Sequence, residues 1–201
     1  MTLRRIRLLL WVLVGVAALG GLWVALRPVP QPGASKQPEM VLASIGGPFT
    51  LVGSDGKPFS SGRLAGRPHA MFFGFTHCPD VCPTTLARLA KLRRQLGKGD
   101  DAFDIVFVTV DPERDGPKEV GAYSGLFGTP VIGLTGSVAQ IEQVKKQFGI
   151  ASAKSPLPGG GYSVDHSASV LLIDRNGQFM ATIAVEEGDD AALAKLRRLT
   201  S

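Results

Sequence analysis

One sequence feature limits most strongly the folds that this chain can adopt. It is an apolar run that leads directly into two cysteines and then into a helical pattern. Residues 69–76 read HAMFFGFT, a nearly continuous apolar stretch that is typical of a strand buried on both faces. Cys78 and Cys82 follow, and residues 83–97 then repeat leucine at helical spacing until Gly97. This order predicts that both cysteines lie where a buried strand ends and a helix begins.

The rest of the chain beyond residue 47 alternates strand and helix patterns. We expect two short strands within residues 48–60, further strands over 104–110, 131–136, 167–174 and 177–185, and helices over 117–127, 137–149 and 189–199. Ser137 is placed to cap a helix, and Arg175-Asn176-Gly177 to turn the last two strands into a hairpin. The pattern predicts an α/β domain with a central sheet, helices on both faces and antiparallel edge strands. With a cysteine just beyond a buried strand, it suggests a thioredoxin-like fold.

The N-terminal segment is of a different kind. Residues 8–26 hold 19 uncharged residues, 16 of them apolar. A helix rises about 1.5 Å per residue, so this length approaches the roughly 30 Å of bilayer hydrocarbon. Trp11 and Trp23 lie near its two ends, and three arginines precede it while one follows. The pattern predicts an uncleaved membrane anchor with a cytoplasmic N-terminus; a cleaved signal peptide, with small residues at 17–21, is the alternative.

Three segments follow from these patterns: an anchor over residues 1–27, a proline-rich linker over 28–40 and a thioredoxin-like domain over 41–201. The expected location is the bacterial inner (cytoplasmic) membrane, crossed once, with the soluble domain on the periplasmic side.

The net charge of +5 does not indicate a nucleic-acid partner. The chain has 22 basic and 17 acidic residues, and residues 1–27 contain four arginines and no acid. The remaining 174 residues therefore carry 18 basic and 17 acidic side chains. Because the domain is almost neutral, we expect no nucleic acid among its partners.

Two cysteines are too few for a disulfide scaffold, so their chemistry is expected to be specific. Four residues apart on a helical turn, Cys78 and Cys82 share a face, and their sulfurs can converge on one centre. The positive end of the helix is expected to lower the thiol pKa. Three residues separate the pair, one more than in thioredoxin-type oxidoreductases, which suits a shared metal at least as well as a disulfide. A buried thiol pair or an inert disulfide is the structural alternative.

Three histidines could complete a metal site. His69 begins a strand and is expected to be exposed or satisfied, and His77 adjoins Cys78, where ring and thiol cannot easily converge on one ion. His166 follows the glycine-rich loop of residues 156–161 and could swing over the strand ends, where sites of open α/β sheets form. Position alone leaves its role open. Two thiolates and one imidazole select copper, and Cu(I) in a trigonal arrangement.

Four aspartates near these motifs have interpretations of their own. Asp80, between the cysteines, is expected to cap the helix. Asp165 could orient the ring of His166 or hold its loop. Turn formation accounts for Asp111 and Asp115.

Three blocks of the sequence carry a resemblance to a known family. They are FFGFTHCPDVCPTTL (72–86), VTVDPERD (108–115) and YSVDHSASVLLID (162–174). In this order they resemble the Sco/SenC family of copper-binding, thioredoxin-like proteins, from about Phe49 to the C-terminus. The resemblance implies that Cys78 and Cys82 are copper ligands and that His166 is the distal copper histidine. It also implies delivery of copper to the dinuclear copper A centre of cytochrome c oxidase, or reduction of the cysteines of that centre.

Two functions of different class are consistent with these observations. The first is a membrane-tethered copper chaperone rather than an enzyme, which holds Cu(I), with Cu(II) as the other oxidation state considered. Its expected client is the copper A subunit of cytochrome c oxidase or another periplasmic cuproprotein. The second is an enzyme, a thiol–disulfide oxidoreductase that needs the dithiol but not His166.

Either function needs a thiol reductant as a partner, because the compartment outside the cytoplasm is oxidising. Peroxidase or redox-sensing chemistry, with Thr76 polarising a peroxide, is a third hypothesis. The metal-like spacing of the two cysteines has no purpose in that chemistry.

Overall fold

The computed structural model describes Trp23 and residues 45–201. The predicted anchor (1–27) and linker (28–40) therefore lie, but for Trp23, outside the described residues, and both stay predictions. Among the helices of the described part, none is both long and apolar enough to cross a membrane. Contacts divide the chain into Met1–Gln37 and Pro38–Ser201, and the second unit contains the sheet and its flanking helices.

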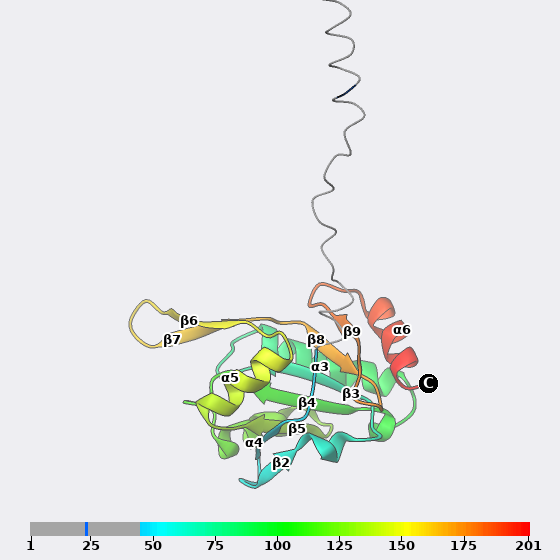
Figure 1. Cartoon of the computed structure of the whole chain (residues 1–201), viewed down its shortest axis with the longest axis horizontal. Helices are drawn as coiled ribbons and strands as arrows, with labels where there is room; N and C mark the ends of the chain where they lie inside the picture. Colours follow the sequence, from blue (N-terminus) through cyan, green and yellow to red (C-terminus); the bar gives the residue numbers. More distant parts are fainter. Residues whose placement is uncertain (1–22, 24–44) are drawn as a thin grey trace, which may run out of the picture. The chain divides into compact units, whose positions relative to one another are not determined.

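A seven-stranded mixed sheet forms the centre of the domain, in the order β2-β1-β5-β4-β3-β8-β9 (Figure 1). Its strands are β1 (Thr50–Gly53), β2 (Pro58–Ser60), β3 (His69–Gly74), β4 (Asp104–Thr109), β5 (Val131–Thr135), β8 (Val170–Ile173) and β9 (Phe179–Ile183). β3, β4 and β5 run parallel, and β1 and β8 join them antiparallel on either side. The expected α/β sheet, with the C-terminal hairpin as antiparallel edge strands, is confirmed.

The two central strands determine where a functional site can form. Every residue of β3 is buried, and β4 is buried from Ile105 onward. They pair in register, from His69 opposite Asp104 to Gly74 opposite Thr109. Because parallel strands end at the same edge of a sheet, the segments that follow Gly74 and Thr109 leave the sheet side by side.

In the described residues 45–201, four α-helices flank the sheet. They are α3 (Val81–Gln95), α4 (Pro117–Ser124), α5 (Val138–Gln147) and α6 (Asp189–Leu199), with short 3₁₀ turns at Ser61–Leu64, Asp100–Ala102 and Gly125–Phe127. Neighbouring side chains of a strand point to opposite faces. Phe73 packs on Phe148 at the end of α5, with ring centroids 5.8 Å apart, whereas Gly74 faces Cys82 of α3. Helices therefore cover both faces of the sheet, as predicted.

Short-range signals in the sequence are confirmed. The hydroxyl of Ser137 accepts the Gln140 N–H (3.3 Å), and the Gln140 side chain accepts the Ser137 N–H (2.9 Å), which together cap α5. Between β8 and β9 the Asp174 carboxylate accepts two turn N–H groups, and Gly177 has a φ of +76°.

A two-stranded ribbon carries the third histidine, and no pattern in the sequence predicted it. β6 (Ser152–Pro156) and β7 (Tyr162–His166) pair antiparallel, with Ser152 opposite His166. Three consecutive glycines with positive φ form the turn, residues 159–161, and Figure 1 shows the ribbon extending beyond the body of the domain. Of the ten residues in its two strands only Val164 is buried, so the ribbon lacks the run of buried apolar residues that reveals a core strand. The strand expected over 167–174 begins only at Val170.

Candidate metal centre

The two cysteines and His166 come together beyond the carboxyl end of β3, although Cys82 and His166 are 84 positions apart in the sequence. Cys78 lies in the loop after β3, Cys82 is the second residue of α3, and His166 is the last residue of β7. One donor atom from each residue, two sulfurs and an imidazole nitrogen, lies within 4.8 Å of the other two. The structure thus brings together the three residues singled out from the sequence; their role as ligands stays a prediction.

The close approach of α3 to the sheet depends on Gly74. A Cβ atom at this position would lie 2.8 Å from Cys82 Sγ, 3.0 Å from Phe72 and 3.2 Å from Phe107. All three neighbours are fully buried and cannot move aside easily. The absence of a side chain at Gly74 therefore makes the space that the Cys82 sulfur occupies.

Sulfur, not carboxylate, accepts the first N–H bond at the start of α3. The backbone N–H of Cys82 donates to Cys78 Sγ, with N and S 3.4 Å apart. Asp80 occupies the N-cap position but forms no side-chain bond to the backbone; its carboxylate accepts the Thr84 hydroxyl instead (3.2 Å). The expected Asp80 cap is therefore wrong, and the Cys78 sulfur lies at the positive end of the helix.

Burial dominates the chemistry of the Cys82 thiol. It raises the pKa of this thiol well above its ordinary value, and the hydrogen bond with Cys78 raises it further. The expected lowering of the thiol pKa by the helix terminus is therefore wrong for Cys82. The metal-free thiol keeps its proton at neutral pH, so a metal ion must displace that proton to bind the sulfur.

The imidazole of His166 presents a bare nitrogen to the cysteines. Its Nδ1 lies 3.0 Å from the carbonyl oxygen of Ser167, which can only accept, so Nδ1 carries the hydrogen. Nε2 keeps its lone pair and lies 3.4 Å from Cys82 Sγ, where it accepts the thiol proton. The rings of Phe72 and Phe75 meet the imidazole edge to face, with centroids 6.0 and 5.9 Å away, and limit how it can turn.

Asp115 anchors the loop that leads to Cys78. Its carboxylate is fully buried and accepts the Thr76 N–H (2.8 Å), the Thr76 hydroxyl (2.6 Å) and the Thr109 hydroxyl (2.7 Å). Turn formation alone therefore understates its role, because Asp115 fixes the chain two residues before Cys78. Since the Thr76 hydroxyl is engaged with this carboxylate, it is not free to polarise a peroxide.

A second group of contacts ties the ribbon to the turn after β4. Arg114 donates through Nε to the Asp111 carboxylate (2.5 Å) and through Nη1 to the Tyr162 carbonyl (2.9 Å). Its guanidinium also lies 3.8 Å from the centroid of the Tyr162 ring, and the Tyr162 hydroxyl donates to Asp111 (2.9 Å). We call Arg114, Asp111 and Tyr162 the Arg114 clamp. The VDPERD block marks part of it in the sequence, but nothing there indicates the contact with Tyr162.

The other two histidines lie away from the cluster. His69 is buried at the opposite end of β3, with Nδ1 3.2 Å from the Arg67 carbonyl oxygen, so one of its two ring nitrogens is satisfied. His77 is half exposed and contacts the Thr76 hydroxyl (3.1 Å) and the Asp115 carboxylate (3.4 Å). Within residues 45–201, neither belongs to a group of potential metal ligands.

Asp165 braces the ribbon. Its carboxylate accepts the hydroxyl of Ser155 from the opposite strand. Of the two roles considered for it, holding the local backbone agrees with this contact, and orienting the His166 ring does not.

The donor set suits a soft ion with three ligands. Bonds of roughly 2.0–2.3 Å to nitrogen and sulfur place three donors around one ion about 3.5–4 Å apart. The separations in the cluster, 3.4 Å between Cys82 Sγ and His166 Nε2 and none above 4.8 Å, require only small side-chain adjustments. Among common metal ions, two sulfurs and an imidazole favour Cu(I).

Comparison with known sequences finds similarity over most of the chain. The SCO1/SenC family matches residues 37–201. The mitochondrial protein SCO2 of Saccharomyces cerevisiae is 36% identical over 157 residues, which are 77% of this chain and 52% of that protein. The chain therefore spans about half the length of that relative.

Solved structures show the same fold. Bradyrhizobium japonicum ScoI with copper bound matches with a TM-score of 0.70 and 39% identity, over 77% of this chain and 99% of that one. BsSco, a member of the Sco family of cytochrome c oxidase assembly proteins in which a disulfide switch is identified, matches with a TM-score of 0.61 and 27% identity. That match covers 80% of this chain and 95% of the BsSco chain.

Proposed function

The chain belongs to the SCO1/SenC family, and on that premise we propose that it binds copper and acts in the assembly of cytochrome c oxidase. In this proposal Cu(I) is cargo, held by Cys78, Cys82 and His166 and delivered to the copper A centre of the oxidase. Another cuproprotein of the same compartment is the alternative client.

The convergence of two sulfurs and one bare imidazole nitrogen carries the proposal. These three donors come from a loop, a helix and a ribbon, and they lie within 4.8 Å of one another. Without metal, the Cys82 thiol donates a hydrogen bond to His166 Nε2, which already holds these two donor atoms close together. Copper binding replaces the thiol proton and needs no large rearrangement of this pair.

Delivery requires that the ion can leave. The unequal burial of the three ligands indicates the side from which a client would approach. Cys82 is buried, whereas Cys78 and His166 are partly exposed. We infer that cysteines of the client approach from the exposed side and replace His166 first. The ion then passes by exchange of ligands, with no change in its oxidation state.

The proposal includes a location. A tether over residues 1–27 would hold the domain at the outer face of the inner membrane, near a membrane-bound client. Its support is the uncharged stretch of residues 8–26 with Arg4, Arg5 and Arg7 ahead of it. In that oxidising compartment a thiol reductant must keep Cys78 and Cys82 ready for copper.

Anaerobic titration of the reduced, purified chain with Cu(I), in competition with a chromogenic chelator, tests the binding site. We expect one copper ion per chain, no tight binding after Cys78→Ala or Cys82→Ala, and binding weakened about tenfold or more by His166→Ala. His77→Ala is the matched control, because this histidine lies outside the cluster. The Cu(I) affinity of the His77→Ala variant should equal that of the unmodified chain. Undiminished binding by the double cysteine variant would refute the site.

A thiol–disulfide oxidoreductase is the second candidate, favoured by the free state of both cysteines. The partly exposed Cys78 sulfur would attack a client disulfide, and the Cys82 sulfur would then displace the client from the mixed disulfide. Two protein thiols are thereby oxidised to a disulfide as the client disulfide is reduced to two thiols. His166→Ala separates the candidates: this reaction needs no imidazole and should continue, while copper binding is weakened.

A further inference from the structure

A cavity of about 320 Å³ lies at the end of β3 opposite the candidate metal centre. β3 begins with His69 at the cavity and ends at Gly74, a span of roughly 15–20 Å at about 3.3 Å per residue, and the cysteines lie beyond it. The volume is at the lower end of the range for small-molecule sites, about 300–1,000 Å³. The cavity is therefore separate from the copper site and large enough for a molecule the size of one aromatic ring.

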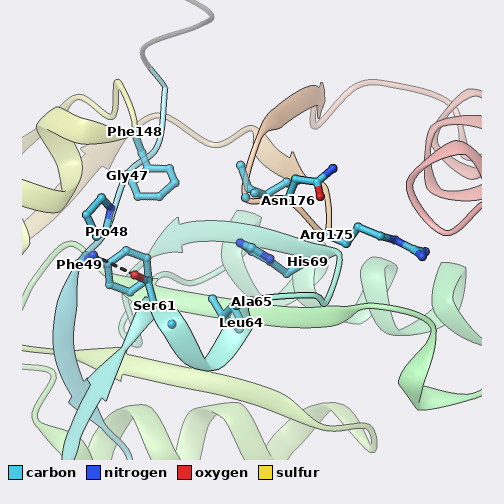
Figure 2. A pocket seen from close by; sticks show the side chains of 13 residues that line it. Gly47, Pro48, Phe49, Ser61, Leu64, Ala65, His69, Phe148, Arg175 and Asn176 are labelled. Atoms are coloured by element: carbon cyan, nitrogen blue, oxygen red, sulfur yellow. Dashed lines mark hydrogen bonds between the residues drawn. The ribbon is translucent and has the colours of Figure 1, made fainter.

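Apolar side chains form most of its walls. Phe49 and Phe148 stand edge to face on one side, with ring centroids 5.9 Å apart, and Leu64 and Ile173 contribute aliphatic surface. The hydroxyl of Ser61 also lines the cavity, but its oxygen already accepts the Phe49 N–H (3.0 Å; Figure 2).

The Nε2 atom of His69, which lines this cavity, lacks a hydrogen-bond partner within the described part of the chain. His69 is only 5% exposed, and its Nδ1 donates to the carbonyl oxygen of Arg67 (3.2 Å), which leaves Nε2 with a lone pair. Across residues 45–201 no group hydrogen-bonds to Nε2. Figure 2 shows the imidazole pointing from β3 into the space between Phe49, Phe148 and Leu64. Because His69 lines the cavity, a ligand or ordered water that enters it can reach this nitrogen and satisfy it.

The charges around the cavity favour an uncharged ligand. Burial lowers the pKa of His69, against the opposing effects of the Arg67 carbonyl and the carboxylates of Asp104 and Asp174, so the ring is neutral at physiological pH. The nearest lining cation, Arg175, points its guanidinium away from the cavity and donates to the Ser201 carbonyl (3.2 Å; Figure 2). A charged ligand, whether an anion or a cation, would therefore have no opposite charge to pair with inside the cavity.

We propose that this cavity is a binding site for a small, planar, uncharged molecule of the phenol class, whose O–H group donates to His69 Nε2. The aromatic body of the ligand would pack against Phe49 and Phe148. The site is independent of copper and of the proposed role in oxidase assembly. Ordered water could satisfy the nitrogen but would gain nothing from the phenyl walls.

Phenol and anisole test the proposal, because anisole has the same ring but no O–H donor. The full-length, metal-free, ¹⁵N-labelled chain is titrated with each compound while the imidazole nitrogens of His69 are followed by NMR. We expect phenol to shift Nε2 upfield in a saturable way, and anisole to bind about 5- to 10-fold more weakly, since it lacks one neutral hydrogen bond.

His69→Phe should abolish the preference for phenol over anisole, and His77→Phe, at the other end of β3, should leave it unchanged. Equal binding of the two compounds by the unmodified chain overturns the proposal without any variant. An Nε2 chemical shift that phenol leaves unchanged also overturns the proposal. It would mean that water or another part of the chain satisfies the nitrogen.

Discussion

Cys78 and Cys82 are four positions apart in the chain but have different surroundings. Their spacing and their place before a helix predicted a shared face, and the structure brings their sulfurs together with the imidazole of His166. The sequence could not show that Cys82 is fully buried while Cys78 is partly exposed. Burial depends on what packs from other elements, so the expected low pKa was wrong for Cys82.

Gly74 is a residue whose role was visible only in the structure, and it carries a prediction. Gly74→Ala would put a methyl group 2.8 Å from Cys82 Sγ, so the sulfur or the helix must move. We expect the free energy of unfolding to fall by about 1–3 kcal/mol, as in other overpacked cores. Copper affinity should fall about tenfold, because the sulfur leaves its position beside His166. Denaturant unfolding and copper competition measure the two effects.

Gly125→Ala is the matched control for this substitution. Gly125 has a helical φ of −73°, and a Cβ there would meet nothing within 4 Å. The free energy of unfolding of the Gly125→Ala variant should differ from that of the unmodified chain by no more than about 0.5 kcal/mol, and its copper affinity should be unchanged. Equal behaviour of the two variants would show that the space beside Cys82 is not limiting.

At the scale of elements, strands and helices with one buried face were predictable, and the ribbon was not. β3, β4, α3 and α5 all carry apolar patterns at strand or helix period, because one or both faces touch the core. The ribbon of β6 and β7 is held by backbone pairing and by its contacts with the Arg114 clamp, and only Val164 of its ten strand residues is buried. No hydrophobic pattern marks such an element, although it carries His166.

The Arg114 clamp should position that element for copper binding. Tyr162 and His166 are the two ends of β7, so release of Tyr162 lets the whole strand shift. Arg114→Lys keeps the charge but loses the forked hydrogen bonds and the stacking on Tyr162. We expect Cu(I) affinity to fall about tenfold in the competition titration.

A double-variant comparison separates positioning from general destabilisation. In the His166→Ala background, Arg114→Lys should have no further effect on copper affinity, since the ligand it positions is gone. Arg63→Lys serves as the control, because Arg63 also lies over an aromatic ring, 4.8 Å from the centroid of Phe59, away from the ribbon. Additive losses for Arg114→Lys and His166→Ala would argue against positioning.

For the whole molecule, the order of the three sequence blocks predicted the family, and the alternation of strand and helix patterns predicted the α/β fold; both are confirmed. The division into anchor, linker and domain stays a prediction. Motif order succeeds here because the blocks mark the ends of β3, β4 and β7, which the sheet and the Arg114 clamp bring to one edge. The exact contacts between blocks, such as Arg114 with Tyr162, depend on packing that no single block contains.

The proposed role of the whole chain predicts an effect on the oxidase. Deletion of the gene should reduce cytochrome c oxidase activity under copper limitation, and added copper should partly restore it. The full chain should complement the deletion, whereas the Cys78→Ala variant should not. Replacement of residues 1–27 by a cleaved secretion signal should complement weakly, because an untethered carrier loses its high local concentration near the client.

Two results would contradict this account. Normal oxidase activity in the deletion strain under copper limitation would argue against a dedicated assembly role. A mature protein whose first residue lies beyond residue 20 would show that the N-terminal segment is a cleaved signal and not an anchor.

The distance along the chain between Cys82 and His166 gives the bound ion a second effect. A metal held by both residues closes a ring of the 85 residues from Cys82 to His166 in the folded chain, and unfolding would pull these two ligands apart. Because the ion binds the assembled site and not the separated ligands, the loaded chain is harder to unfold than the empty one. If the chain delivers copper as proposed, each delivery would return it to its less stable form, and we expect proteases to digest the emptied carrier first.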